Sequence, residues 1–238
     1  TLANWESGQD HVGLYLHNGN EYLEGMVGAY KSRTVPFNVN YRYVEEELLY
    51  LLRDAKCRAL IYHASFAPRL QNIRAQLPDL QVLLQVTDDS ETPLLSGAVE
   101  YEAALRSAAT ECPPATWSGD DLYMLYTGGT TGMPKGVLWR QEDIFFAALG
   151  GEPLGGASLK DVSAVAEAAQ NGGYLRSLPA PPLMHGAAHW MALTCMHQGG
   201  TVIMQGQPTH LDPDDIWSTA AREKASFMTC LLYTSPSP

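Results

Sequence analysis

The sequence lacks the features of a secreted, membrane-spanning or nucleic-acid-binding protein. Its start, Thr1 to Glu6, has no basic stretch followed by an apolar run and is therefore not a signal peptide. No apolar stretch approaches the roughly 20 residues that a membrane-spanning helix needs. Lysine and arginine do not cluster, and the net charge is -11 over 238 residues. Nucleic acid is therefore excluded as a main partner, because neutralising phosphates needs clustered basic side chains.

Cysteine is also scarce. The four cysteines are scattered and form no Cys-x-x-Cys pair, so we expect reduced thiols in a cytoplasmic protein rather than a disulfide framework. Hydrophobic residues make up 45% and charged residues 17% of the chain, which is typical of a protein that buries a core. The length suits one large domain or two small ones, and it does not indicate an oligomeric state.

Strand-like and helix-like patterns alternate along the chain. Asn18 and Glu21 resemble an N-cap pair for the first helix. The alternation predicts an α/β fold, mainly parallel sheets with helices on both faces. A break at Cys112–Pro114 predicts a junction between two subdomains near residues 110–120. Strands are expected at 12–16, 35–39, 58–62, 82–86, 122–126, 136–139, 174–178, 201–204 and 225–230, and helices at 22–30, 44–52, 66–77, 99–109, 159–169 and 212–224.

The segment 126–136, Tyr-Thr-Gly-Gly-Thr-Thr-Gly-Met-Pro-Lys-Gly, carries the clearest chemistry. Its loop glycines allow tight turns and close approach to the backbone, whose N–H groups can cradle anionic oxygens. Threonine hydroxyls add donors, and a lysine adds a mobile positive charge that suits phosphate. The residues expected to bind a polyphosphate are Thr127, Gly128, Gly129, Thr130, Thr131, Gly132 and Lys135.

Two familiar phosphate-binding motifs do not fit this segment. A Walker-type loop needs Gly-Lys-Ser/Thr at the start of a helix, whereas Met133 and Pro134 separate Gly132 from Lys135, and a strand follows. The Gly-x-Gly-x-x-Gly fingerprint of dinucleotide-binding folds is absent from the loop. From spacing alone, a plain hairpin turn that happens to contain threonines remains an alternative.

The whole segment resembles the signature of the AMP-forming adenylating superfamily, which includes acyl-CoA synthetases, luciferases and peptide-synthetase adenylation domains. The match runs through Lys135-Gly136-Val137, with Gly128 at a position that is often serine in the family. The resemblance covers about residues 10–229, so residues 1–230 are expected to form part of the family's large N-terminal domain. Within the family the chain looks most like bacterial fatty-acyl or steroid side-chain CoA ligases. The segments that support the resemblance are 18–31, 35–43, 138–143 and 182–186.

The resemblance implies an enzyme with two half-reactions that use ATP, Mg²⁺ and CoA. A carboxylate attacks the α-phosphorus of ATP to give acyl-AMP and pyrophosphate, and the CoA thiol then displaces AMP. Residues 127–132 would wrap the β- and γ-phosphates, and Lys135 would help to neutralise the departing pyrophosphate. His185 would line or gate the acyl pocket. The partners are then a small carboxylic acid, ATP and CoA, which places the reaction in fatty-acid and lipid metabolism.

The resemblance also implies that the chain is a fragment. The family's catalytic residues, including the lysine of its small C-terminal domain, are expected beyond residue 238, and the first elements of its fold before Thr1. Residues 231–238, which end in a Ser/Pro-rich run, are interpreted as a foreign or disordered tail. The alternative functions are a nucleotide-binding protein without catalysis, an inactive truncated fragment or an interaction module that binds no ATP.

Histidines raise the question of a metal. His185, His189, Cys195 and His197 lie within thirteen residues. No acid follows the first histidine and no cysteines are paired, so core or pocket histidines are favoured and no metal site is predicted. The remaining histidines are expected at the surface, namely His11, His17, His63 and His210.

Overall fold

The computed structural model describes residues 3, 6–112, 114–128, 132–153 and 156–230. The predicted tail at 231–238 lies outside these residues. The chain divides into two compact units, Thr1–Glu142 and Asp143–Pro238. The junction expected near residues 110–120 lies inside the first unit. In the described residues, no helix is both long and apolar enough to cross a membrane.

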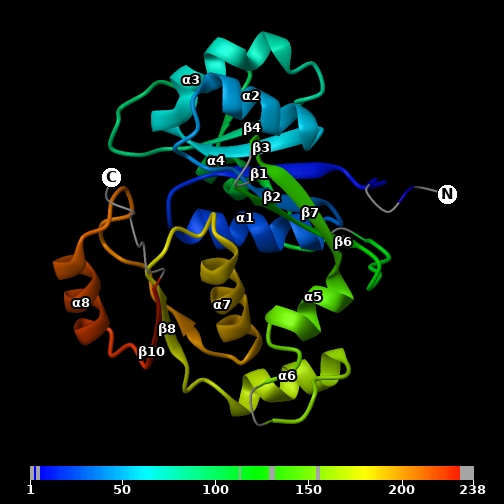
Figure 1. The fold of residues 1–238 in the computed structure, drawn as a ribbon, viewed down its shortest axis with the longest axis vertical. Helices are drawn as coiled ribbons and strands as arrows, with labels where there is room; N and C mark the ends of the chain where they lie inside the picture. Colours follow the sequence, from blue (N-terminus) through cyan, green and yellow to red (C-terminus); the bar gives the residue numbers. More distant parts are fainter. Residues whose placement is uncertain (1–2, 4–5, 113, 129–131, 154–155, 231–238) are drawn as a thin grey trace. The chain divides into compact units, whose positions relative to one another are not determined.

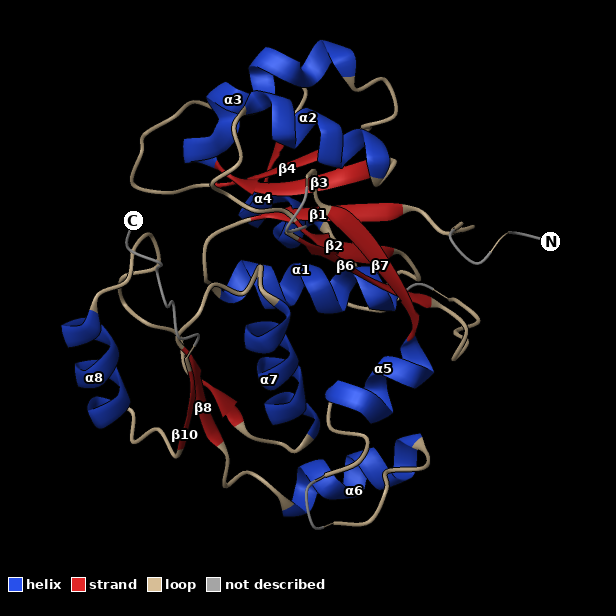
Figure 2. Ribbon diagram, viewed as in Figure 1, coloured by secondary structure: helices blue, strands red, loops and turns tan. Residues whose placement is uncertain are grey.

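A five-stranded parallel sheet forms the centre of the first unit, as the alternating pattern predicted. Its strands, in spatial order, are β2 (Val35–Asn38), β1 (His11–Tyr15), β3 (Cys57–His63), β4 (Val82–Val86) and β5 (Val99–Glu100). Helix α1 (Asn20–Lys31) lies on one face, and α2 (Glu45–Asp54) and α3 (Ala67–Ile73) lie on the other (Figures 1 and 2). Short 3-10 turns, Ala64–Phe66 and Arg74–Gln76, flank α3. Because helices cover both faces, most residues of the central strands β1 and β3 are buried or half-buried whichever face they point to.

Helix α1 approaches the sheet closely at one glycine. A Cβ on Gly25 would lie 2.8 Å from Cδ1 of Ile61 and 3.1 Å from Cδ2 of Leu14. Gly28, three residues further on, is exposed and has no described atom within 4 Å of such a Cβ. Two glycines in the same helix therefore have opposite surroundings.

Capping carboxylates explain where three helices begin. Glu100 accepts hydrogen bonds from the backbone N–H groups of Glu102 and Ala103, so α4 (Tyr101–Ser107) starts after a short strand and is shorter than the helix expected over 99–109. Asp161 caps α6 (Val162–Asn171), which begins later than expected for the same reason. Asp212 caps α8 (Pro213–Arg222), close to its expected start.

Two predictions about polar residues are wrong. Gly19, not Asn18, occupies the N-cap position of α1, and no side chain caps that helix. His11, expected at the surface, is buried. Its Nδ1 donates to the carbonyl of Ala55 at the end of α2, and burial lowers its pKa. His17 and His63 are half-buried. The sequence pattern could not show this, because these burials depend on contacts between distant segments.

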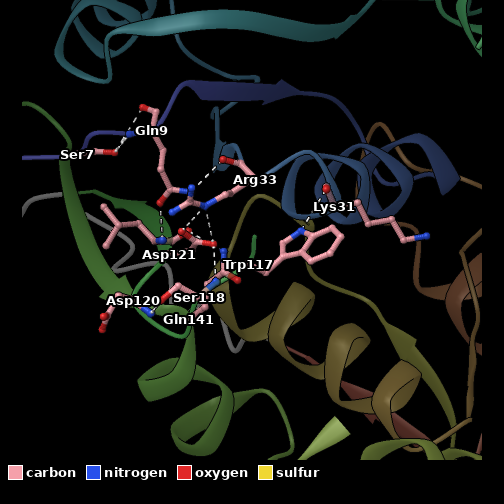
Figure 3. A network of polar contacts seen from close by, with 10 residues as sticks. Ser7, Gln9, Lys31, Arg33, Trp117, Ser118, Asp120, Asp121 and Gln141 are labelled. Carbon is pink, nitrogen blue, oxygen red and sulfur yellow. Dashed lines mark hydrogen bonds and ion pairs between the residues drawn. The ribbon is translucent and has the colours of Figure 1, made fainter. Parts of the chain in front are cut away.

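An antiparallel hairpin completes the first unit. It consists of β6 (Leu122–Thr127) and β7 (Lys135–Arg140), followed by α5 (Gln141–Ala148). The start of β6 is held by Asp121, whose carboxylate accepts from Arg33 Nε at 2.9 and 3.2 Å (Figure 3). Gln9 joins the same network, since it accepts from the N–H of Leu122 and donates to the carbonyl of Arg33. The hairpin is therefore tied to the first sheet at the end that lies away from its loop.

The second unit contains a smaller sheet of three parallel strands. They are, in spatial order, β10 (Phe227–Thr229), β8 (Arg176–Pro179) and β9 (Thr201–Val202). Helix α7 (Gly186–His197) buries Ala188, His189 and Ala192. Nδ1 of His189 donates to the carbonyl of Leu183 at 2.8 Å. The histidine is thus a core residue of this unit.

We predict opposite effects of substitution at the two α1 glycines. Gly25→Leu should lower the free energy of unfolding by about 1–3 kcal/mol, because the added atoms enter a packed core. Gly28→Ala should raise it by about 0.5–1 kcal/mol through helix propensity. Urea unfolding measures both. A Gly25→Leu variant as stable as the unmodified chain would contradict the close approach of α1 to the sheet.

We also predict a pH dependence from His189. Burial lowers its pKa to about 4, against an ordinary value of 6.5. Between about pH 4 and pH 6.5, the His189 ring is therefore protonated in the unfolded chain and neutral in the folded protein. Stability from the neutral ring is complete above pH 6.5 and is lost as the pH falls toward 4, by up to about 3 kcal/mol. Urea unfolding at pH 7.5 and 4.5 should show a smaller pH effect in His189→Gln than in the unmodified chain. Equal pH effects would contradict this assignment.

Candidate phosphate-binding site

The β6–β7 hairpin brings the two ends of the predicted phosphate loop together. In the strand register, Thr127 lies opposite Lys135 and Tyr126 lies opposite Gly136. Side chains of directly opposite residues share one face of a hairpin, so the side chains of Thr127 and Lys135 leave the backbone on the same face, and both residues are exposed. Gly129, Thr130 and Thr131 lie outside the described residues.

The backbone at the described loop glycines is open. A Cβ added to Gly128 or Gly132 would meet no described atom within 4 Å, and both residues are exposed. Anionic oxygens can therefore approach the N–H groups there closely. An open glycine backbone beside a lysine is suited to phosphate oxygens.

The stem of the loop is fixed by the side chain of Asn38, from the end of β2. Its Nδ2 donates to the carbonyl of Tyr126 at 2.8 Å, and its Oδ1 accepts from the N–H of Tyr126 at 2.7 Å. The phenol of Tyr126 in turn donates to Oδ2 of Asp54 at 2.6 Å. Burial and this hydrogen bond raise the pKa of Tyr126, so the phenol keeps its proton and stays a donor.

Gly136 completes the stem because it leaves room for the ring of Tyr126. A Cβ on Gly136 would lie 2.9 Å from Cζ of that ring. The ring also packs on Phe37, with centroids 5.8 Å apart. The glycine after the lysine is therefore a steric requirement of the stem and does not depend on an unusual backbone angle.

A cavity of about 610 Å³ lies beside the hairpin. Its volume is within the range of small-ligand pockets. Two lysines and two carboxylates share its lining, so positive and negative charges balance there. The lining includes Lys56, Lys135, Asp54, Glu6, His11 and Tyr126.

The other predicted site residue, His185, belongs to the second unit. It occupies the N-cap position of α7, is half-buried, and its N–H donates to the carbonyl of Pro182 at 2.9 Å. The hydrogen bond from His189 to Leu183 fixes the same turn. The structure therefore defines the backbone around His185 within its own unit.

The described part of the chain contains no group of three or more histidine, cysteine, aspartate or glutamate side chains that could hold a metal ion. Cys195 is buried beside the backbone of Leu175 and Thr201, which is a core position. The chemistry that the described loop can supply is hydrogen-bond donation and one positive charge.

Sequence reasoning missed the roles of Asn38 and Asp54. Asn38 could have been noticed as a polar residue at the end of an apolar strand, because such a residue needs a buried partner. Its partner is 88 positions away in the sequence, which no local pattern reveals.

Two CoA ligases are similar to this chain over most of its length. The medium-chain acyl-CoA ligase Mig of Mycobacterium avium is 49% identical over 229 residues, which is 96% of this chain and 42% of the relative. A 3-oxocholest-4-en-26-oate–CoA ligase of Rhodococcus rhodochrous is 40% identical over 82% of this chain and 36% of the relative. The inhibitor-bound N-terminal domain of FACL13 from Mycobacterium tuberculosis has a TM-score of 0.70 at 27% identity, covering 92% of this chain and 49% of that one.

The chain spans less than half the length of each of these proteins. The acetoacetyl-CoA synthetase of Streptomyces lividans, with a TM-score of 0.74 at 19% identity, shows the same fold. The family described as "AMP-binding enzyme" matches residues 6–231. By this match, the chain belongs to the AMP-binding enzyme family.

Proposed function

We propose that the β6–β7 hairpin binds the phosphate groups of ATP in an acid–CoA ligase of which this chain forms part. One observation carries the proposal, namely that the hairpin sets Lys135 beside Thr127 at the mouth of a loop whose described glycines are open. The two similar ligases of Mycobacterium avium and Rhodococcus rhodochrous supply the reaction class, since both are CoA ligases.

The chain's own residues would act by binding and by offsetting charge. N–H groups at Gly128 and Gly132 and the hydroxyl of Thr127 would donate to the β- and γ-phosphate oxygens. Lys135 would reduce the negative charge that builds on pyrophosphate as the acid attacks the α-phosphorus. Mg²⁺, when bound, would supply further positive charge, held by phosphate oxygens with a loop threonine hydroxyl as a protein ligand.

The proposed acid is a fatty acid, with medium chain length favoured by the 49% identity to a medium-chain ligase. A steroid side-chain acid is the second candidate, favoured by the 40% identity to a cholestenoate ligase. His185 would line the acyl pocket, and CoA would accept the acyl group. A cytoplasmic location and the two-subdomain division stay predictions.

A second candidate function is nucleotide binding without turnover. It is favoured by the content of the described loop, which offers phosphate-binding groups but no general base or nucleophile. Exchange of labelled pyrophosphate into ATP, with and without added fatty acid, separates the two. Carboxylate-dependent exchange supports the ligase, and ATP binding without exchange supports the second candidate for this chain.

We predict that Lys135→Ala weakens the binding of Mg-ATP by about 10- to 100-fold, because a charge-assisted interaction with phosphate is lost. Isothermal titration calorimetry measures the change. Lys160→Ala removes the same charge from an exposed position in the second unit and serves as the matched control, with affinity expected to stay within about twofold. Equal affinities for Lys135→Ala and the unmodified chain would show that the loop is assigned wrongly.

A further inference from the structure

The β6–β7 hairpin is joined to the five-stranded sheet by a side chain rather than by a backbone ladder. Strand β2 is at the edge of that sheet, and the described backbone pairing of β6 is with β7. Asn38, the last residue of β2, donates to the carbonyl of Tyr126 and accepts from its N–H. An asparagine amide carries a donor and an acceptor as a peptide unit does, so this one side chain replaces a rung of the ladder.

This contact lies next to both ends of the phosphate loop. Tyr126 directly precedes Thr127, and its cross-strand partner Gly136 directly follows Lys135. Fixing the backbone of Tyr126 therefore fixes the first loop N–H groups and the strand that begins with the lysine. Asn38 is 7% exposed and Tyr126 also 7% exposed. Buried hydrogen bonds of this kind are not replaced by water when one partner is removed.

A second contact restrains Tyr126 through its side chain. The phenol of Tyr126 donates to Asp54 at the end of α2, and its ring occupies the space that a side chain at position 136 would fill. Tyr126 is thus held at its N–H, its carbonyl and its hydroxyl, by two different elements of the first unit. The other end of β6 is held separately by Arg33 and Asp121.

We propose that Asn38 is a positioning residue for the phosphate groups of ATP. It contacts no phosphate, but sets the direction of the loop N–H groups and of Lys135 through the backbone of Tyr126. This inference rests on the proposed function. It adds a residue outside the loop on which the loop's affinity for nucleotide depends.

The test compares two variants that each remove or weaken one attachment of the hairpin. Asn38→Ala removes the attachment beside the loop, and Asp121→Asn removes the ion pair at the opposite end. Each variant is measured for its unfolding in urea, for Mg-ATP affinity by calorimetry, and for amide hydrogen exchange of residues 122–140 without nucleotide. We expect both variants to lose stability. Asn38→Ala alone should lose affinity, by roughly tenfold, and should exchange faster at residues 126–136.

A third variant checks whether the amide's donor is what the loop needs. Asn38→Asp keeps an acceptor for the N–H of Tyr126 but, when ionised, has no donor for its carbonyl. Protonation of the new carboxyl restores that donor. The affinity of Asn38→Asp, divided by that of the unmodified chain at each pH, should therefore rise as the pH falls, whereas the same ratio for Asn38→Ala should stay flat.

The outcomes separate this inference from the proposed function. If the unmodified chain binds Mg-ATP and Asn38→Ala binds within about twofold of it while remaining folded, the positioning role is overturned. That role is also overturned if Asp121→Asn lowers affinity as much as Asn38→Ala, because loss of stability would then explain both. If the unmodified chain does not bind Mg-ATP, the proposed function fails. In that case unchanged exchange at residues 126–136 in Asn38→Ala would also refute the anchoring of the loop.

Discussion

The attachment of the β6–β7 hairpin to the edge of the parallel sheet is the constraint on which the candidate site depends. A two-stranded hairpin is marginal by itself in water, and the loop it carries is rich in glycine, which adds conformational freedom. The structure offsets this freedom at both ends of β6, with the amide of Asn38 beside the loop and the ion pair of Asp121 with Arg33 at the far end. The Asp121 carboxylate is almost fully buried, so it needs Arg33 as well as the N–H of Ser118.

Side-chain contacts around Tyr126 also explain the order of residues in the segment 126–136. A tyrosine before the loop can reach Asp54 only if the residue opposite it has no side chain, and Gly136 meets that condition. The lysine at the start of β7 then stands next to Thr127. Gly128 and Gly132 have different surroundings, since a Cβ on either would meet no described atom within 4 Å. Gly136 thus makes room for the ring of Tyr126, whereas the open backbone at Gly128 and Gly132 is what the proposed phosphate binding would use.

Much of the architecture could be predicted from the sequence because it depends on local patterns. The apolar runs at 12–16 and 58–62 are strands of a parallel sheet, and the strand–loop–strand course around residues 126–136 is as predicted. The N-cap of α1, expected at Asn18 and found at Gly19, is a local error, whereas the other misses concern contacts between distant segments. The burial of His11 against Ala55 and the bonding of Asn38 to Tyr126 join residues 44 and 88 positions apart, and no periodicity records them. The roles of individual loop residues in binding stay predictions.

We propose that the loop between Thr127 and Lys135 binds the phosphates of ATP. The most direct measurement is a titration of the isotope-labelled chain with Mg-ATP, followed by backbone amide NMR. We expect the largest saturable shifts on the backbone amides of the non-proline residues in 127–136, and far smaller shifts there with AMP, which lacks the β- and γ-phosphates. Saturable shifts confined to other parts of the chain, or equal shifts with AMP, would contradict it.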